Sequence, residues 1–451
     1  MQETAFIRRP KAAFLVGAAT SNSGKTTLTI GLLRALRERG FDVQPFKCGP
    51  DYIDPKYHAI ASGRESVNLD TWLASSEHVS SLFAHYSHDA DVSVVEGVMG
   101  LFDGYQASRG SSAEIARLLG IPVILVVNAK SVAYSVAPLI YGFKHFDSSI
   151  HVAGVIFNQV ASASHASFLQ KACEDAGVSC LGYLPRMKEI ELPSRHLGLT
   201  LEASYQLDDF SMRIAEALEQ YVDMERLVEL CAVNFDGCIQ PVAMQGTSMK
   251  CFLPKNKCRI AVACDDAFNF TYRYNLERLS AVGQVAFFSP MHDEVLPETD
   301  FVYLPGGYPE FFLSELAANR TMQESIRDYV ENGGFLLAEC GGMMYLCDHI
   351  CGMDAVSYPM VGVYPLEATM QDMKLHLGYR MLECGTQIFR GHEFHYSDVR
   401  PWGEKGIQLV GRQLNARGER VSTALYRYKN ALAGYTHLYW GESNIFDLFI
   451  E

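Results

Sequence analysis

The sequence predicts an α/β protein of two domains, each built on a largely parallel sheet. Apolar segments of strand length alternate with helical patterns in the first part of the chain, and a second series of the same kind begins at Arg259. Between the two series the periodicity fades and turn-forming pairs such as Asp236-Gly237 appear. Strands that alternate with helices are typical of doubly wound sheets. We expect domains over 1–235 and 258–451, joined by a linker over 236–257.

The composition narrows the classes of function. Hydrophobic residues make up 48% and charged residues 20% of the 451 residues, which is ordinary for a globular chain. The net charge of −14 argues against a nucleic-acid partner. No apolar stretch approaches the roughly 18 residues of a membrane helix. The 12 cysteines include no CxxC pair, which indicates free thiols in a reducing compartment. We therefore expect a cytoplasmic protein with no membrane contact.

A loop of small residues follows the first predicted strand, 12–16, and ends in Gly-Lys-Thr-Thr. The helical spacing of Leu28, Leu32 and Leu36 follows it. A loop between strand and helix can wrap polyphosphate with backbone N–H groups, with Lys25 on the β/γ-phosphates and the Thr26 hydroxyl on Mg²⁺. The alternative is an ordinary turn. The residues that we assign to ATP are Ser21, Asn22, Ser23, Gly24, Lys25, Thr26 and Thr27, with Asn158 after a later strand placed to meet the adenine edge.

Acidic residues follow two further predicted strands. The strand over 41–47 leads to Asp51, and the strand over 92–95 ends in Glu96-Gly97. The carboxyl ends of parallel strands meet where α/β sheets bind ligands, so Glu96 is expected to hold Mg²⁺. The alternative is an acid that ends a strand without a further role. The stretch 68–72 lines a pocket or starts a helix capped by Asp70, and the sequence leaves both open.

A loop framed by Pro and Gly holds Arg195 and His196. These two side chains bind an anionic substrate, or the loop is a solvated turn. Closing helices are expected over 201–230.

In the second domain, the strand over 335–338 runs into Glu339-Cys340-Gly341-Gly342. A residue on a sharp strand-to-helix turn between small residues is typical of a nucleophile elbow, and the helix N-terminus favours a thiolate. The N–H of Gly341, with that of Gly307, is expected to form an oxyanion hole.

A nucleophilic cysteine needs a base, and three histidines are candidates. His392 and His395 lie in Gly-His-Glu-Phe-His, and His437 follows an apolar segment near the chain end. The alternative for each is a packed or surface imidazole.

These motifs together resemble the cobyrinic acid a,c-diamide synthase family over about residues 12–440. The most specific stretch is Cys48-Gly-Pro-Asp-Tyr-Ile-Asp-Pro55, and the others are Gly-Lys-Thr-Thr, 68–70, 96–100, 193–199, 261–268 and 391–395. The resemblance implies a P-loop doubly wound domain of the dethiobiotin synthetase type. It also implies a flavodoxin-like class I glutaminase domain.

The resemblance implies a two-site reaction. Cys340 and His437 release ammonia from glutamine. ATP phosphorylates an acetate side chain of a corrinoid, and ammonia converts the acyl phosphate to an amide, at the a and c positions in turn. Thr26, Asp51 and Glu96 are then the Mg²⁺ ligands, and Tyr52, Ile53, Asp54 and Asp103 lie near the corrinoid or the activated carboxylate.

The sequence departs from the wider pattern at two places. Many class I glutaminases carry an acid two residues after the catalytic histidine, where this chain has Tyr439, so another group orients His437 or the cysteine and histidine act as a dyad. Glu393 is a weaker substitute for that acid. Ala19 stands where the strict phosphate-loop pattern has Gly and is small enough to keep the backbone near phosphate.

Several readings compete within and outside this family. Relatives amidate hydrogenobyrinate or nickel-sirohydrochlorin, whereas the four-amide cobyric acid synthase has other motif forms. A partition-type switch ATPase would need a second loop lysine, and position 20 is Thr20. The expected partners are the corrinoid, ATP with Mg²⁺ and L-glutamine, without a prosthetic group. The sequence leaves the oligomeric state open, and a homodimer is compatible with it.

Overall fold

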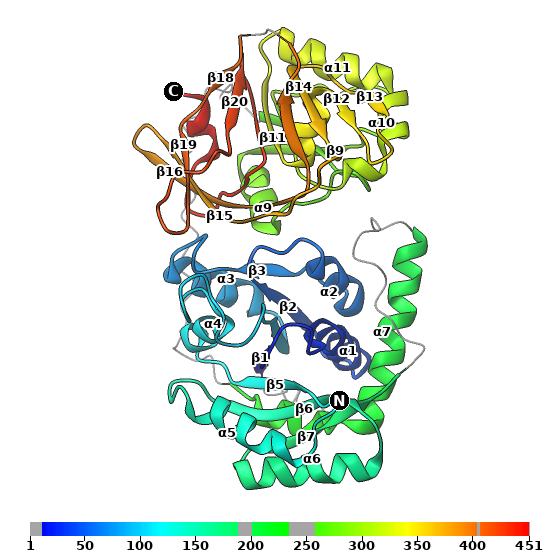
Figure 1. Cartoon of the computed structure of the whole chain (residues 1–451), viewed down its shortest axis with the longest axis vertical. Helices are drawn as coiled ribbons and strands as arrows, with labels where there is room; N and C mark the ends of the chain where they lie inside the picture. The colour runs from blue at the N-terminus through cyan, green and yellow to red at the C-terminus, as the bar shows by residue number, and fades with distance from the viewer. Residues whose placement is uncertain (1–10, 188–200, 234–257, 404–405, 451) are drawn as a thin grey trace, which may run out of the picture. The chain divides into compact units, whose positions relative to one another are not determined.

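The computed structural model describes residues 11–187, 201–233, 258–403 and 406–450, with only the backbone of 201–205 (Figure 1). The chain divides into two compact units, Met1–Met244 and Gln245–Glu451. The predicted linker over 236–257 lies outside the described residues, so its limits and those of the two predicted domains stay predictions.

The first unit is built on a seven-stranded sheet in the order β3-β2-β4-β1-β5-β6-β7, with parallel pairing throughout. Its strands are β1 (Ala12–Ala18), β2 (Val43–Cys48), β3 (Val67–Leu69), β4 (Val92–Glu96), β5 (Val123–Asn128), β6 (Val152–Val160) and β7 (Ser179–Pro185). β1 lies between β4 and β5, and the strand order runs outward in opposite directions from it. Open α/β sheets bind ligands at such a switch point, beyond the carboxyl ends of the strands.

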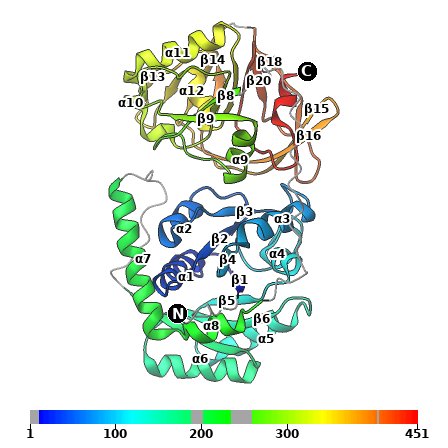
Figure 2. The same ribbon diagram turned by 180° about the vertical axis from the view of Figure 1, so that it is seen from behind.

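Helices cover both faces of this sheet, with α1, α2 and α7 on one face and α3 and α4 on the other (Figures 1 and 2). The helices are α1 (Lys25–Glu38), α2 (Asp54–Ser62), α3 (Ser76–Ser87), α4 (Ser112–Leu119), the 3-10 helix η1 (Tyr134–Val136), α5 (Ala137–His145), α6 (Ala163–Ala176), α7 (Leu201–Tyr221) and α8 (Met224–Leu230). The predicted apolar face of α1 is fully buried. α7 lies along α1, where Arg34 pairs with Asp208 at 2.6 Å.

The second unit also contains a seven-stranded sheet, in the order β18-β20-β21-β11-β10-β8-β9. Its strands are β8 (Cys258–Ala263), β9 (Gly283–Phe288), β10 (Phe301–Leu304), β11 (Phe335–Glu339), β18 (Gln408–Leu409), β20 (Leu425–Tyr428) and β21 (Ala431–Gly434). The strands from β21 to β9 pair in parallel, and β20 and β18 add an antiparallel edge. The loops that follow β10 and β11 therefore emerge at the same end of the sheet.

Two four-stranded sheets complete the second unit, in the orders β13-β12-β14-β17 and β19-β15-β16-β22. Their strands are β12 (Cys347–Cys351), β13 (Ser357–Pro359), β14 (Tyr364–Thr369), β15 (His376–Cys384), β16 (Gln387–His395), β17 (Asp398–Pro401), β19 (Arg412–Asn415) and β22 (His437–Tyr439). The helices are α9 (Arg273–Val282), η2 (Pro309–Phe311), α10 (Leu313–Ala318), α11 (Arg320–Glu331), α12 (Gly341–Leu346) and η3 (Ile445–Phe449). β16 and β22 are antiparallel and place His392 opposite His437.

Both units have the α/β fold that the sequence predicts, and the expected strands over 92–95 and 335–338 appear as β4 and β11. The ambiguous stretch 68–72 forms the end of β3 and a turn. Asp70 Oδ1 accepts the N–H groups of Trp72 and Leu73 at 2.8 and 2.9 Å, so Asp70 caps this turn and not a helix. Among the described helices, none is long and apolar enough to cross a membrane.

Candidate active sites

The predicted phosphate-binding loop joins β1 to α1 at the centre of the first sheet. Gly24 ends the loop with a φ of +92°, a left-handed conformation that favours Gly. A Cβ at Gly24 would lie 2.0 Å from Asn158 Nδ2, so this position also needs Gly for space. Asn158 Nδ2 donates to Ser23 O at 3.0 Å, which supports the loop. The contact between Asn158 and adenine stays a prediction.

The other loop residues differ in exposure. Ser21 and Asn22 are exposed, and Thr27 is half-buried on the first turn of α1. The buried Lys25 ammonium donates to the Met99 carbonyl in the loop after β4. Burial, followed by the nearby Lys47, lowers the pKa of Lys25. Lys25 thus lies where the loops after β1 and β4 meet, as expected of a phosphate ligand.

Thr26, Lys47, Asp54 and Glu96 form a cluster where α1, β2, α2 and β4 meet. Thr26 Oγ1 donates to Glu96 Oε1 at 2.7 Å. Lys47 Nζ lies 2.6 Å from Asp54 Oδ2 and 3.1 Å from Glu96 Oε1, and 3.8 Å from Asp51 Oδ2. A buried ammonium among three carboxylates compensates charges that desolvation alone would make costly.

The charges in this cluster set its protonation states. Burial raises the pKa of Asp54 to about 6, against the opposing effect of Lys47. Burial also disfavours the charged form of Glu96. However, Lys47, His58 and Thr26 together outweigh burial and hold the pKa of Glu96 below its usual range. Glu96 is therefore ionised at neutral pH.

Lys47 and His58 both bond to Glu96, and neither was predicted as a site residue from the sequence. His58 Nε2 lies 2.6 Å from Glu96 Oε2, and His58 Nδ1 lies 3.1 Å from Ser66 Oγ. The signal for His58 is its position four residues after Asp54, which puts both side chains on one face of α2. The signal for Lys47 is a charged residue within an apolar strand, since a buried lysine requires anions beside it.

The predicted metal ligands Thr26, Asp51 and Glu96 supply a hydroxyl and two carboxylates, the hard oxygen ligands that Mg²⁺ prefers. Among the described residues, no group of three or more His, Cys, Asp and Glu is arranged around one metal position. Mg²⁺ at nucleotide sites, however, takes much of its coordination from phosphate and water. Thr26 and Glu96 are in contact, and the Asp51 carboxylate lies 3.8 Å from the Lys47 ammonium that also contacts Glu96. The donors present fit a magnesium ion that is held jointly with a nucleotide.

The predicted substrate residues lie partly around this cluster. Tyr52 and Ile53 form the turn before α2, and Asp54 begins that helix. Asp51 Oδ1 fixes the turn by accepting the N–H groups of Ile53 and Asp54 at 2.8 and 3.0 Å.

Two loops hold the remaining predicted substrate residues. Asp103 lies after β4, where its Oδ2 accepts the Gly100 N–H at 2.9 Å. Arg195 and His196 lie outside the described residues, so their role stays a prediction.

In the second unit, Cys340 lies at a sharp turn between β11 and α12, as expected of a nucleophile elbow. Its φ of 48° and ψ of −107° are strained for a residue other than Gly. Burial raises the pKa of the Cys340 thiol, and Glu310 adds to that effect. The Gly341 N–H at the start of α12 lowers the pKa of the thiol, as expected of a helix terminus, but burial outweighs it. α12 has only six residues, which limits its dipole, so the thiol needs a base.

The loop after β10 brings the predicted oxyanion donors close to the predicted base. A Cβ at Gly341 would lie 3.1 Å from Gly307 N, so the two predicted donors are neighbours. A Cβ at Gly306 would lie 2.2 Å from His437 Cε1, so the imidazole packs directly against this backbone. Cys340, which adjoins Gly341, and His437 therefore meet at one loop.

β22, which carries His437, is held along both edges. One edge pairs with β16. On the other edge, Glu339 Oε1 accepts the Leu438 N–H at 3.1 Å, and Asn275 Nδ2 donates to Leu438 O at 2.9 Å. Because Glu339 directly precedes Cys340, one side chain joins the strand that carries His437 to the strand that leads to Cys340.

Sequence reasoning missed both Glu339 and Asn275. The signal for Glu339 is the one that selects Glu96, an acid at the end of a buried parallel strand. The Tyr303 hydroxyl donates to Glu339 Oε2 at 2.7 Å. Burial raises the pKa of Glu339 to about 8, although Tyr303 and the Leu438 N–H oppose the shift. The protonated acid therefore prevails at pH 7.

The three candidate bases have different surroundings. The His392 and His437 rings stack with centroids 5.1 Å apart, and His395 stacks on Tyr435 at 3.7 Å. Burial, followed by His392 and His395, lowers the pKa of His437 well below its usual range. Burial lowers the pKa of His395 to about 4. Of the three candidates, His437 is the one that packs against Gly306, in the loop that holds the predicted oxyanion donor Gly307.

Glu393, the weaker substitute for an orienting acid, is engaged by other groups. Its Oε2 pairs with Arg380 Nη2 at 2.7 Å, and its Oε1 accepts the Thr436 hydroxyl at 3.4 Å. The Arg380 guanidinium thus takes up the charge of Glu393.

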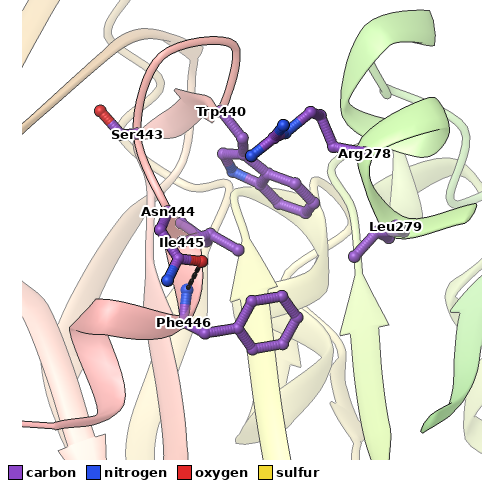
Figure 3. Close-up of a pocket in the computed structure, with 7 residues that line it drawn as sticks. All are labelled: Arg278, Leu279, Trp440, Ser443, Asn444, Ile445 and Phe446. Atoms are coloured by element: carbon purple, nitrogen blue, oxygen red, sulfur yellow. Dashed lines mark hydrogen bonds between the residues drawn. The ribbon is translucent and has the colours of Figure 1, made fainter. Parts of the chain in front are cut away.

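A small pocket lies beside β22, between α9 and the segment that follows β22 (Figure 3). Its lining residues are Arg278, Leu279, Trp440, Ser443, Asn444, Ile445 and Phe446. Figure 3 shows the Trp440 indole, Leu279 and the Phe446 ring arranged around it, and Asn444 Oδ1 accepts the Phe446 N–H at 3.4 Å. No predicted site residue lines the pocket, which is separate from the candidate catalytic groups.

The fold and the two sites define a class of protein in which a nucleotide-binding domain is joined to a cysteine-type glutamine amidotransferase. Family models match both parts. Residues 14–199 match the CobQ/CobB/MinD/ParA nucleotide binding domain, and residues 259–445 match the CobB/CobQ-like glutamine amidotransferase domain.

Curated relatives match along nearly the whole chain. A cobyrinate a,c-diamide synthase from Dehalococcoides mccartyi is 38% identical over 446 residues, which is 95% of each chain. A hydrogenobyrinate a,c-diamide synthase from Brucella anthropi is 38% identical over 436 residues, 94% of this chain and 98% of that one. The chain belongs to the cobyrinate/hydrogenobyrinate a,c-diamide synthase family of glutamine-dependent ligases, which confirms the resemblance found in its sequence.

Proposed function

We propose that the protein amidates the a- and c-acetate carboxylates of cobyrinate, with ATP and glutamine as co-substrates and Mg²⁺ as the metal. A carboxylate is a poor acyl donor, so ATP first phosphorylates it. Ammonia then attacks the acyl phosphate, the C–N bond forms, and phosphate leaves. One ATP and one glutamine are used for each amide.

Residues of the first unit supply the phosphoryl-transfer site. The loop amides and Lys25 cradle the phosphates. When bound, Mg²⁺ neutralises charge on the transferred phosphoryl group, and Thr26, Asp51 and Glu96 hold it. Lys47 balances the charge of the neighbouring carboxylates, and Asp54 and Asp103 face the activated carboxylate.

Residues of the second unit supply ammonia. His437 takes the proton from Cys340 Sγ as the sulfur attacks the glutamine amide carbon, and it returns that proton to the departing ammonia. The N–H groups of Gly307 and Gly341 stabilise the oxyanion. Water then hydrolyses the thioester to glutamate.

The observation that carries this proposal is the presence of a phosphate loop and a strained cysteine elbow in one chain that spans its relatives. A switch ATPase would leave the Cys340 site without a purpose. The free cysteines, ten among the described residues, support a reducing compartment and therefore the cytoplasm.

The choice of tetrapyrrole is tested by product mass. The full chain is incubated with cobyrinate, hydrogenobyrinate or nickel-sirohydrochlorin, each with ATP, Mg²⁺ and glutamine. We expect the diamide from cobyrinate. A diamide formed only from hydrogenobyrinate or nickel-sirohydrochlorin would reassign the substrate, and no ATP-dependent amide from any of them would contradict the proposal.

A further inference from the structure

The orientation of His437 requires an explanation, since the residue two positions further on is Tyr439 and not an acid. A general base works only when its ring nitrogen faces the proton that it takes. The Tyr439 ring instead packs edge-on against Tyr272, with centroids 5.4 Å apart and an interplanar angle of 83°.

Tyr272 is connected to His437 through His392. A 2.9 Å hydrogen bond joins the Tyr272 hydroxyl to His392 Nδ1. The His392 ring stacks on the His437 ring at 5.1 Å with an interplanar angle of 19°. All three side chains are 3% exposed or less, so solvent does not compete for these contacts.

At its edge, the His437 ring meets the backbone of Gly306. His437 Cε1 lies so close to Gly306 that a Cβ there would be 2.2 Å away. With His392 stacked on its face and Gly306 against its edge, the ring has little freedom to rotate. The hydrogen bond from Tyr272 holds the His392 ring in place, and the stacked His392 ring fixes the plane of the His437 ring.

We infer that Tyr272 and His392 are positioning residues of the glutaminase, and that their hydrogen-bonded stack holds the His437 ring in place of the usual acid. The inference rests on the proposed role of His437 as base. Neither residue touches glutamine in this account. Both act on the rate of proton transfer, while glutamine binding is left to other groups.

The test measures kcat and KM for glutamine hydrolysis by the full chain. Tyr272→Phe removes the hydroxyl of the Tyr272–His392 hydrogen bond. His392→Phe keeps a ring that can stack on His437 but removes the nitrogen that bonds to that hydroxyl. We expect each to lower kcat by about tenfold with KM within about twofold. Because both residues act through one stack, kcat of the double variant should be no more than about twofold below that of the less active single variant.

Tyr364→Phe is the matched control. Tyr364 is fully buried, and its hydroxyl donates to Ala431 O at 2.8 Å, a bond of the same kind outside the stack. The Tyr364→Phe variant should keep kcat within twofold of the parent value. An equal loss of kcat in Tyr364→Phe and Tyr272→Phe would overturn the inference, as would single variants that match the parent.

The pH profile gives a readout that a purely structural role would not move. The titratable and charged groups on elements packed around His437 include His392, His395, Glu393 and Arg390 on β16, Tyr272 before α9, Tyr439 on β22, and Cys340 and Glu339 at the end of β11. Of these, His392 and then His395 lower the pKa of His437, after burial. His392→Phe should therefore move the acid limb of kcat/KM to higher pH. An unmoved limb would contradict the inference.

His437→Ala separates this inference from the proposed function. If that variant keeps glutaminase activity, the assigned base is wrong and the inference falls with it. If it loses activity while Tyr272→Phe and His392→Phe do not, the positioning role alone is wrong. Should His392→Phe fail to fold, the comparison of Tyr272→Phe with Tyr364→Phe decides.

Discussion

The Thr26 hydroxyl donates to the Glu96 carboxylate across 2.7 Å, which joins the first turn of α1 to the end of β4. The two strands beneath them are neighbours, since Val16 on β1 pairs with Glu96 itself. A hydroxyl and an ionised carboxylate at the switch point of a parallel sheet are suited to a divalent cation bound with phosphate.

Lys25→Ala and Glu96→Gln should each lower amide synthesis at least about 100-fold even when ammonia replaces glutamine, because both residues act on phosphoryl transfer. Product formation with ammonium chloride, ATP and Mg²⁺ checks this. Lys171→Ala, which removes an exposed lysine paired with Asp175, is the control and should behave as the parent. Near-normal turnover of Lys25→Ala or Glu96→Gln would remove that residue from the ATP site.

Cys340→Ala should abolish the use of glutamine and leave ammonia-dependent amidation. The thiol is the nucleophile of the glutaminase alone, so free ammonia bypasses its loss. Glutamate release and amide product are measured in parallel. Cys347→Ala, which changes another buried cysteine at the start of β12, should retain glutamate release. Loss of both activities in Cys340→Ala would contradict the two-site model.

His437→Ala should lower glutamate release far more than His395→Ala, by about 100-fold or more against tenfold or less. The base must be neutral to accept the Cys340 proton. Because the pKa of His437 lies well below its usual range, activity should persist as pH falls through about 6.5 and decline only at lower pH. The reverse order of the two variants would move the base to His395.

Glu339→Gln should be tolerated at pH 7, whereas Glu339→Ala should lower glutamate release about tenfold or more. At pH 7 the buried acid is protonated, and the Gln amide keeps an oxygen for the Leu438 N–H while its own N–H donates to the Tyr303 oxygen. Ala would leave those groups unpaired, at a cost of about 1–3 kcal/mol for each. Steady-state kinetics of the two variants checks this.

The raised pKa of Glu339 also makes the stability of the folded chain depend on pH. The pKa of Glu339 is raised on folding to about 8, so the folded chain binds more protons between about pH 4.5 and 8. The wild type therefore loses stability as pH rises through that range. Glu339→Gln should lack this loss, and its melting temperature relative to the parent should be higher at pH 9 than at pH 5. A constant difference would show that Glu339 is ionised in the folded state.

The sequence predicted the parallel sheets and several groups at strand ends because both depend on local patterns. Glu96 ends an apolar strand, and Cys340 follows one between small residues, so a single stretch of sequence identifies each. The elbow at Cys340 needed no knowledge of distant segments.

The residues that sequence reasoning missed depend on contacts between distant segments. Lys47 and Glu96 are brought together by the register of β2 against β4. Asn275 meets Leu438 across 163 positions of sequence. The raised pKa of the Cys340 thiol was missed for a related reason: the motif gives the helix terminus, which favours the thiolate, but not the burial that outweighs it.

The contacts that hold β22 also affect association with other chains. An edge strand with unsatisfied N–H and C=O groups is a template for pairing with a foreign strand. Here the side chains of Glu339 and Asn275 occupy the Leu438 groups, and Asn275 Oδ1 accepts the Trp440 N–H at 2.9 Å. The outer edge of the strand that carries the base is therefore closed to domain swapping and to edge-to-edge aggregation.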